Sequence, residues 1–299
     1  MHVYESIFAA GVALAIGLTA PAAGQEAESP EAETGEFDSL VRGDRSWSIQ
    51  GRPLVWFPAM SGDAQFGGAA ANTSLSVSRD LGLDDNEPTF LGEFIWRRDR
   101  WMVLVEAFDF DTESTGPARA TFTVNGTPVS AGTPLTHDFG MTSVSAHLGY
   151  DFFGDLLEPD PTDPQDMRAD LHLSGLIGGR AVGLDQRFAA AGGPTVSFDE
   201  WAGAIEAGLR LDLFVDPEWD GGGVWDVAVT VLGGVGEYDS VETATLGVTF
   251  SMTYMPAENI GITFGYRQLD LIIERDEPGS NYEFDGRLAG LFVGATVRF

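Results

Sequence analysis

The sequence predicts an all-β protein, a transmembrane antiparallel up-and-down β-barrel of about ten strands. Three observations predict this fold. Beyond Arg45, apolar and polar residues alternate with period two in blocks of roughly 10 to 18 residues, which is the pattern of membrane-spanning strands. Short joins between blocks tend to alternate with long ones, and aromatic residues gather near one set of the predicted strand ends.

The composition limits the function before any motif is considered. The 299 residues include no cysteine, which excludes disulfides, cysteine nucleophiles and thiolate metal sites. The 46 acidic and 16 basic residues give a net charge of −30, which repels phosphates, so we expect no nucleic-acid partner. This acidity suits solubility in a salty habitat; alternatively, acidic loops gather divalent cations or basic ligands.

Two segments precede the predicted barrel domain, which covers residues 46–299. We predict a signal peptide at 1–24, because Ile7–Ala20 is an apolar run that ends in small residues and is too short for a spanning helix. The residues before that run carry Glu5 and no basic side chain, which departs from the usual leader. Residues 25–45 are acidic and poor in large apolar residues, so we predict a disordered periplasmic tail.

The predicted strands follow in order along the rest of the chain. The clearest alternation lies in the seventh, where Trp225, Val227, Val229 and Val231 face one side and the residues between them face the other. The predicted strands are 46–58, 87–98, 100–113, 136–153, 167–184, 197–215, 223–237, 240–256, 259–274 and 282–299.

The joins between strands predict the orientation of the barrel. Residues 97–100 and 256–258 form short turns, whereas 61–86 and 114–135 are long loops. Short turns on one side and an even strand count place both termini in the periplasm. The join at 154–166 is long for a periplasmic turn.

One long loop contains a hairpin signal, Asn125-Gly126 between two Thr- and Val-containing stretches. This dipeptide is typical of a type I′ turn. We expect a hairpin that protrudes on the extracellular side as a candidate ligand-binding or surface-contact element. The other long loop, 61–86, is expected to help cap the barrel mouth.

Large aromatic residues predict an interfacial girdle at the periplasmic strand ends, because amphipathic rings prefer the headgroup level of a bilayer. These residues are Trp47, Trp96, Trp101, Phe152, Phe153, Trp225, Tyr254 and Phe299.

The C-terminus resembles the assembly signal of bacterial outer-membrane proteins. That signal is a terminal phenylalanine preceded by apolar residues at alternate positions, here Leu291, Val293, Ala295, Val297 and Phe299. The resemblance implies recognition by the barrel-assembly machinery. It also implies export to the outer membrane, with outer-membrane lipid and lipopolysaccharide as surroundings.

Several strand motifs are similar to those of a widespread family of small, uncharacterised Gram-negative outer-membrane barrels, described as OmpA-like or porin-like. They are Trp47–Trp56, Arg100–Asp111, Gly265–Asp270 and the C-terminus. The resemblance covers about 46–299 and implies fold and location only, because strand motifs carry no chemistry and imply no cofactor.

Charged residues fall on the inward side of the predicted strands. A soluble core would bury them at high cost, whereas a barrel points them into a polar lumen. Both signs occur, so in a narrow ten-stranded bore they are expected to pair and partly plug it. The predicted lumen charges are Arg52, Glu93, Arg97, Glu106, Arg180, Glu206, Arg210, Asp212 and Arg267.

Three classes of function follow. The leading interpretation is a charge-paired barrel with a structural or surface-interaction role, and the first alternative is a porin-like channel for small solutes. The third is a rim enzyme, such as an omptin-like protease using Asp109-Asp111 and Asp170-His172, or a lipid A deacylase using His172. The strand map places the two pairs on opposite sides of the membrane and His172 inside the lumen. We therefore predict no catalytic residue.

His147 and His172 offer one candidate metal site, since they could neighbour each other on the fourth and fifth strands beside Asp151 or Asp170. Satisfied lumen histidines are the more common outcome for such residues, so no metal is predicted.

Overall fold

The computed structural model describes residues 47–66, 74–83, 87–119, 121–124, 126–153, 168–216, 223–238, 240–257, 259–275 and 282–299. The predicted signal peptide, the acidic tail and the join at 154–166 lie outside these residues. Within them, no helix is long and apolar enough to cross a membrane.

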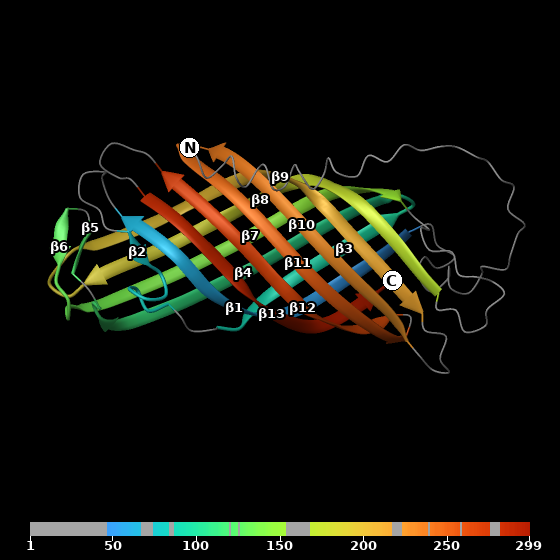
Figure 1. Cartoon of the computed structure of the whole chain (residues 1–299), viewed down its shortest axis with the longest axis horizontal. Coiled ribbons are helices and arrows are strands. Elements are labelled where there is room, and N and C mark those ends of the chain that lie inside the picture. The colour runs from blue at the N-terminus through green and yellow to red at the C-terminus, as the bar shows by residue number, and fades with distance from the viewer. Residues whose placement is uncertain are drawn as a thin grey trace, which may run out of the picture.

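The described chain forms a closed antiparallel β-barrel (Figure 1). Its sheet contains eleven strands, of which the two-residue β2 (Leu75–Ser76) is an appendage on β1, so ten strands form the wall. Each wall strand pairs with the next along the chain, and β1 pairs with β13 to close the ring. The wall strands are β1 (Trp47–Phe66), β3 (Thr89–Arg98), β4 (Trp101–Pro117), β7 (Pro134–Phe153), β8 (Arg168–Ala190), β9 (Thr195–Asp216), β10 (Val224–Tyr238), β11 (Val241–Ala257), β12 (Ile260–Arg275) and β13 (Tyr282–Arg298). The predicted fold class and strand number are confirmed.

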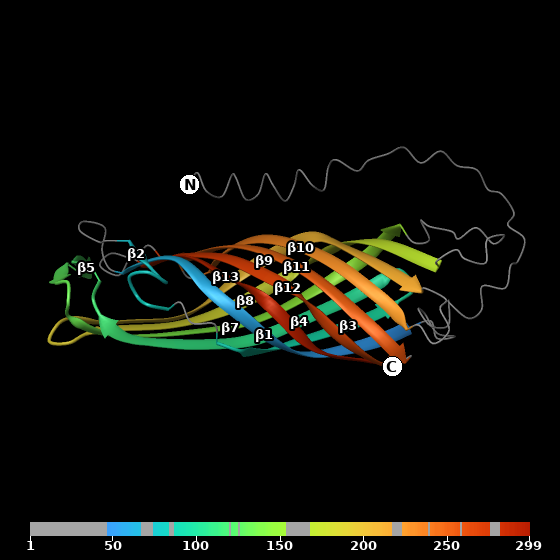
Figure 2. The ribbon, with the colours of Figure 1, turned by 60° about the horizontal axis from the view of Figure 1, so that its bottom comes forward.

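The two ends of the barrel differ and are named here by what they carry. Gln50 near the start of β1 lies opposite Arg298 at the end of β13, so both termini of the barrel lie at one end, the terminal end. The opposite, hairpin end carries a separate two-stranded sheet of β5 (Phe122–Val124) and β6 (Thr127–Val129) (Figures 1 and 2). Gly126 in its turn has φ +74°, whereas Asn125 lies outside the described residues.

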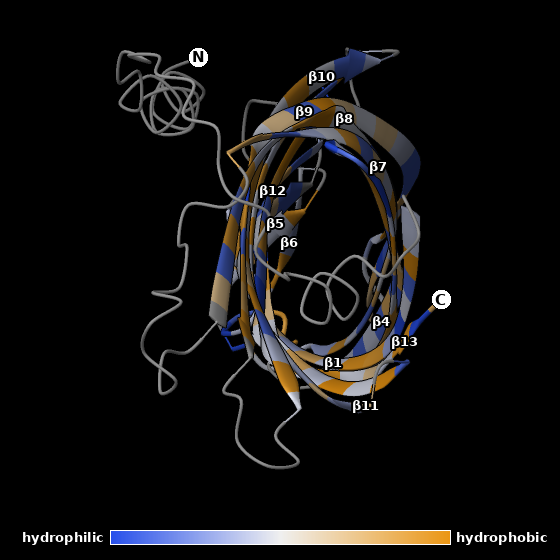
Figure 3. Cartoon of the chain, turned by 90° about the vertical axis from the view of Figure 1, so that its right-hand side faces the viewer, coloured by the Kyte–Doolittle hydropathy of each residue, from blue (hydrophilic) through white to orange (hydrophobic). Residues whose placement is uncertain are grey.

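Alternation along each strand separates an inner from an outer face. Viewed along the axis from the terminal end, the wall is oval, and hydrophobic and hydrophilic residues alternate along its strands (Figure 3). In the terminal-end half, the outward residues are apolar and exposed, as expected for a surface in contact with lipid. They include Val55, Phe57, Phe94, Val144, Leu148, Ile177, Ile205, Leu211, Val229, Phe250, Ile262, Phe264, Leu291 and Val293.

The outer face changes character in the hairpin-end half, where the same outward phase carries charge. The wall there is predominantly acidic, with few basic residues. Its exposed charged residues include Asp63, Asp109, Asp111, Glu113, Asp185, Arg187, Asp199, Glu237, Glu242, Glu283, Asp285 and Arg287.

The inner face changes in the opposite sense. In the hairpin-end half, the interior of the barrel is a packed apolar core that includes Phe110, Phe139, Phe188 and Phe284. Aromatic contacts cross the bore here, with the Phe139 and Phe284 ring centroids 5.5 Å apart. The lumen charges lie in the other half, so the prediction of a charge-lined lumen describes only the terminal-end half.

Both long loops contribute to this core. Phe122, Val124 and Val129 of the hairpin are buried, and Phe122 packs edge-on against Phe188 at 5.9 Å. The hairpin therefore covers the barrel end instead of protruding as a free element, because its apolar face has a core to pack against. In the first long loop, Leu75 and three other apolar residues, Val77, Leu81 and Leu83, are likewise buried.

Several wall strands are longer than their predicted ranges at the hairpin end. The first strand continues from 58 to Phe66, the third to Pro117 and the fifth to Ala190. In the hairpin-end half, apolar residues face inward and polar residues face outward. The pattern expected of a lipid-facing strand, with apolar residues outward, therefore ends before the strand itself ends.

Candidate functional site

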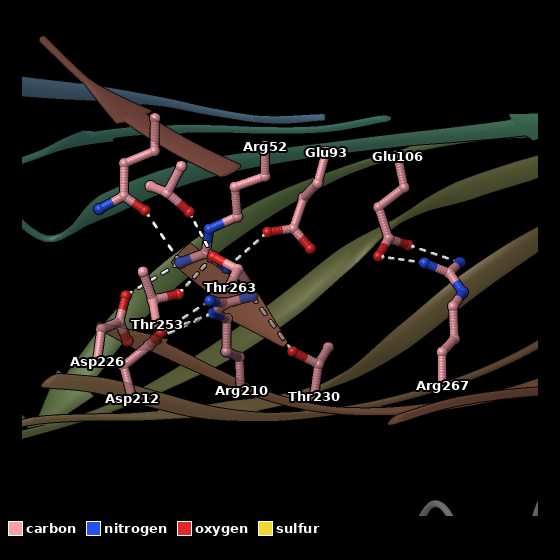
Figure 4. A network of polar contacts seen from close by, with 12 residues as sticks. Arg52, Glu93, Glu106, Arg210, Asp212, Asp226, Thr230, Thr253, Thr263 and Arg267 are labelled. Carbon is pink, nitrogen blue, oxygen red and sulfur yellow. Dashed lines mark hydrogen bonds and ion pairs between the residues drawn. The ribbon is translucent and has the colours of Figure 1, made fainter. Parts of the chain in front are cut away.

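The candidate site is a network of charged side chains inside the terminal-end half of the barrel. Each member occupies an inward position of its strand, where the neighbouring positions point to the outer face. Two groups of side chains form it, one centred on Arg52 and Arg210 and one on Arg180 and Arg267. Figure 4 shows the surroundings of Arg52 and Arg210, and the Arg267–Glu106 pair of the second group.

Arg52 of β1 is the centre of the first group and is 2% exposed. Its Nη1 donates to Glu93 Oε1 at 2.7 Å, and Glu93 is its register partner on β3. Its Nη2 donates to Gln50 Oε1 at 3.1 Å and to Asp226 Oδ2 at 3.0 Å. Asp226 lies on β10, four strands away around the ring, so this ion pair spans the bore.

Asp212 of β9 makes a second link across the bore. It accepts from Arg210 Nε at 2.9 Å, two residues away on its own strand. It also forms an ion pair at 2.9 Å with Nη2 of Arg97, which lies on β3. Arg210 further donates through Nη1 to Thr230 Oγ1 on β10 at 3.4 Å (Figure 4).

The second group lies closer to the apolar core. Arg267 of β12 reaches across the bore to Glu106 of β4, with Nη1 2.8 Å from Oε1 and Nη2 3.2 Å from Oε2. Its guanidinium also sits 5.8 Å from the ring centroid of Trp56 and 5.7 Å from that of Phe108. Bidentate geometry and flanking aromatic faces make this a well-held cross-lumen pair.

Arg180 connects Glu106 to Glu206, which is fully buried. Its Nε donates to Glu206 Oε1 at 2.8 Å, and its Nη2 lies 3.6 Å from Glu106 Oε2. Glu206 also accepts from Thr245 Oγ1 at 2.7 Å and contacts His147 Nε2 at 2.8 Å. The carboxylate thus has hydrogen-bond partners from three other strands, which offsets the cost of burying it.

All nine predicted lumen charges take part in these two groups: Arg52, Glu93, Arg97, Glu106, Arg180, Glu206, Arg210, Asp212 and Arg267. The sequence reasoning missed Asp226 as a member, although the alternation of the seventh strand already placed it on the polar side. It also missed the contribution of the inward aromatics Trp56 and Phe108.

The residues considered for an enzyme do not assemble into one site. Asp109 and Asp111 are exposed on the outer wall of β4 toward the hairpin end. Asp170 and His172 point inward near the terminal end of β8. His172 is held between two carboxylates, with Nδ1 2.6 Å from Asp151 and Nε2 2.7 Å from Asp170.

The idea that His147 and His172 neighbour each other is wrong. His147 lies opposite Gly178, six residues along β8 from His172, which corresponds to about 20 Å at about 3.3 Å per residue. Among the residues that the structure describes, no group of three or more potential ligands could hold a metal ion.

Comparisons with known proteins add only distant likenesses. No protein-family model and no curated protein matches the chain. Its structure is similar to Neisserial surface protein A (TM-score 0.32, 13% identity, covering 85% of this chain and 98% of that one). It is also similar to the outer membrane protease OmpT from Escherichia coli (TM-score 0.36, 7% identity, covering 84% of this chain and 97% of that one). A third similar structure is the Ralstonia pickettii toluene transporter TbuX (TM-score 0.31, 10% identity, covering 83% of this chain and 72% of that one). Scores this low carry no inference about activity or ligand.

Proposed function

We propose that this chain is an integral outer-membrane barrel with a closed lumen and a structural or surface-interaction role. The network across the lumen carries the proposal. Three ion pairs, Arg52–Asp226, Arg97–Asp212 and Arg267–Glu106, join strands on opposite walls at two levels of the bore. A path for ions would have to break buried pairs that the surrounding side chains hold.

The apolar core beyond the network supports the same conclusion. Above the charged levels, Phe198 of β9 stacks on Tyr282 of β13 with ring centroids 3.7 Å apart. A permeating solute would have to pass both a paired polar layer and an aromatic layer. The porin-like alternative needs an open bore, which these two layers argue against. The proposal also gives the chain no catalytic role.

The outer face supports placement in a bilayer with the terminal end in the periplasm. Aromatic residues surround that end, including the Trp101–Tyr150 and Trp225–Tyr254 pairs with centroids 5.0 and 4.8 Å apart. The hairpin-end half, with its acidic outer wall, then projects into the extracellular space. Lipopolysaccharide and the divalent cations that accompany it are the proposed surroundings of that wall.

The end of β13 supports the proposed assembly route. Leu291 and Val293 are exposed on its outer face, in phase with Ala295 and Val297, and Phe299 is 62% exposed. We propose that the barrel-assembly machinery recognises this outward row.

The proposal is tested by recording ion conductance across planar bilayers that contain the refolded protein. We expect no discrete openings from the wild-type barrel. Removing one cross-lumen partner with Arg267→Ala leaves Glu106 with Arg180, 3.6 Å away, as its ion-pair partner and should admit water and small currents. Steady wild-type openings whose selectivity changes with Arg210→Glu would contradict the closed lumen and identify a narrow channel.

A further inference from the structure

The hairpin-end part of β9 has a partner strand on one side only. β9 pairs with β8 along its length, beginning with Thr195 opposite Ala189. Its pairing with β10 begins only at Ile205, opposite Val235. In Figure 1, the β8–β9 hairpin accordingly extends farther toward the hairpin end than β10 does. Within the described part of the chain, residues 195–202, named here the β9 edge, therefore pair with no strand on the β10 side.

The hydrogen-bonding pattern determines which backbone groups lie on this open side. Ala190 N donates to Pro194 O across the β8–β9 turn, so the even-numbered residues of β9 direct their N–H and C=O groups toward β8. The odd-numbered residues point the other way, because a Cβ on Gly236 of β10 would come within 1.8 Å of the Gly203 carbonyl oxygen. Four residues therefore direct N–H and C=O groups away from β8, with no described strand opposite them: Thr195, Ser197, Asp199 and Trp201.

Side chains on the inner face hold the β9 edge in place. Phe198 stacks on Tyr282 of β13, and Glu200 forms an ion pair with Arg275 of β12. The pairing of β8 with β9 contains no bulge, and residues 195–202 include neither proline nor a basic residue. Natural sheet edges are often protected by proline, lysine or a bulge. The β9 edge is thus an anchored, extended strand whose backbone can pair with a further strand.

The outer face around the β9 edge is acidic. Asp199 lies opposite Asp185 of β8, and at the nearby end of β10 Glu237 lies opposite Glu242 of β11. All four side chains are exposed, and Arg187 of β8 is the basic exception among the described residues beside them. Two copies of this chain paired through their β9 edges would bring like charges together, which is destabilising. The charges instead favour a strand that carries lysine or arginine.

We propose that the β9 edge binds an extended, basic segment of another polypeptide, which adds to the sheet as an antiparallel strand. This inference rests on the proposed surface-interaction role and names the kind of partner. In added strands, main-chain hydrogen bonds supply affinity and alternate side chains supply specificity.

The geometry of the edge specifies the pattern of the partner. The odd-numbered residues of the β9 edge have outward side chains, and directly opposite residues of antiparallel strands share a face. The partner residues that hydrogen-bond to them therefore also face outward, beside Asp199 and Glu237, and are the basic ones. The residues between them face inward beside Val196 and Phe198 and are apolar.

The test uses the protein refolded into lipid nanodiscs and a peptide of alternating lysine and valine that is fluorescently labelled at its N-terminus and amidated at its C-terminus. Fluorescence anisotropy measures binding, and empty nanodiscs are the blank. We expect saturable binding to the wild-type barrel. A peptide N-methylated at its lysines should bind at least about tenfold more weakly because it cannot donate to β9, whereas N-methylation at the valines should have little effect. Equal affinities of the two methylated peptides would overturn the proposal and leave only non-specific charge attraction.

Substitutions on the edge test the same contact from the side of the barrel. Ser197→Pro removes one N–H on the open side, where proline is tolerated, and should weaken binding of the unmodified peptide about tenfold. The matched control Ser197→Ala keeps that N–H and should bind like the wild type, as should Glu283→Gln on the outer face of β13. Asp199→Asn should weaken binding less than Ser197→Pro does, and mainly at low salt. Unchanged affinity in a folded Ser197→Pro barrel would contradict the proposal.

Amide exchange decides the matter if Ser197→Pro does not fold. In the wild-type protein, the bound peptide should protect the amides of Thr195, Ser197 and Asp199, whereas those of Val196 and Phe198, which face β8, should not change. Bound peptide without added protection at the odd-numbered amides would overturn the proposal. A dimer that protects these amides in the absence of peptide would also overturn it, and would identify a second copy of the chain as the partner.

Discussion

The two halves of this barrel are built from the same strands but have opposite polarity. In the terminal-end half, apolar residues face outward and charged residues are buried, as Val229 and Asp226 illustrate on β10. In the hairpin-end half, acids face outward and phenylalanines face inward, as Asp111 and Phe110 illustrate on β4. A strand that keeps its alternation therefore reverses its chemistry part-way along. In the proposed membrane placement, the reversal marks where lipid gives way to water outside the wall.

In the proposed placement, lipid surrounds the terminal-end half, where the lumen is the polar compartment and its charges pair with one another. Water surrounds the hairpin-end half, whose interior provides the hydrophobic core. The following substitutions compare positions on one strand across this boundary, in order of decreasing expected effect.

Removing a lumen charge should be the most damaging change. Glu106→Leu leaves Arg267 without its bidentate partner and should lower the free energy of unfolding by about 3–5 kcal/mol. Asp111→Leu, five residues along the same strand on the outer wall, should change it by only about 0.5 kcal/mol. Urea unfolding in lipid vesicles, monitored by tryptophan fluorescence, measures the free energy of unfolding of both variants. Equal losses would mean that the two faces of β4 are misassigned.

Truncating an aromatic residue in the core should cost nearly as much. Phe139→Ala opens space against Phe110 and Phe284 and should destabilise the barrel by about 3–5 kcal/mol. Leu148→Ala lies on the same strand but faces outward in the membrane half, where lipid tails fill the space, so its cost should be smaller. The same unfolding assay applies, and a larger loss at Leu148 would argue for a dry protein contact on that face.

Placing a charge on the apolar outer face of the terminal-end half should have an intermediate effect on stability. Val229→Arg should cost about 2–4 kcal/mol if the residue lies near the bilayer midplane. Glu237→Arg, on the outer face of the same strand toward the hairpin end, should cost close to nothing, because its side chain is already in water. A comparable penalty at residue 237 would extend the lipid belt to the hairpin end.

The smallest effect should come from the loop beside β2. The Arg79 side chain, followed by the Ser76 backbone N–H, holds the pKa of Asp80 below its usual value of 3.8. Because the folded pKa is the lower one, the ionised carboxylate stabilises the loop at neutral pH, and this contribution is lost only as the pH falls below about 4. Arg79 is largely exposed and solvent screens its pairing with Asp80, so this effect should be the smallest of the four. The protection factor of the Ser76 amide, which corrects for the intrinsic pH dependence of exchange, should therefore fall as the pH drops below about 4 in the wild type and change little in Asp80→Asn.

Much of this architecture could be predicted because the signal is local. Alternation such as Trp225-Val227-Val229-Val231 determines which side chains face outward, and the predicted starts of the wall strands agree with the structure to within about two residues. The predicted lumen charges could be recognised because alternate residues of a strand face opposite sides. A charged residue between two lipid-facing neighbours must therefore face the lumen.

The rest depends on contacts between distant residues. Whether Arg52 pairs with Asp226 depends on the stagger of β1 against β10 around the ring, which no single strand reveals. The apolar residues in the hairpin-end half face inward, whereas those in the terminal-end half face outward. A pattern of outward apolar residues therefore predicts an end of β1 at 58, although the strand continues to Phe66. The hairpin was expected to protrude because its turn signal says nothing of the core that Phe122 reaches.

The reversal of polarity is tested most directly by cysteine labelling along β13, because the chain has no native cysteine. Asp285→Cys and Leu291→Cys, both on the outer face, would be expressed in intact cells and treated with a membrane-impermeant maleimide. We predict rapid labelling at 285, where water surrounds the wall, and none at 291, which lipid covers. Labelling at 291, or protection at 285 in a folded barrel, would contradict the assignment of the hairpin-end half to the extracellular space.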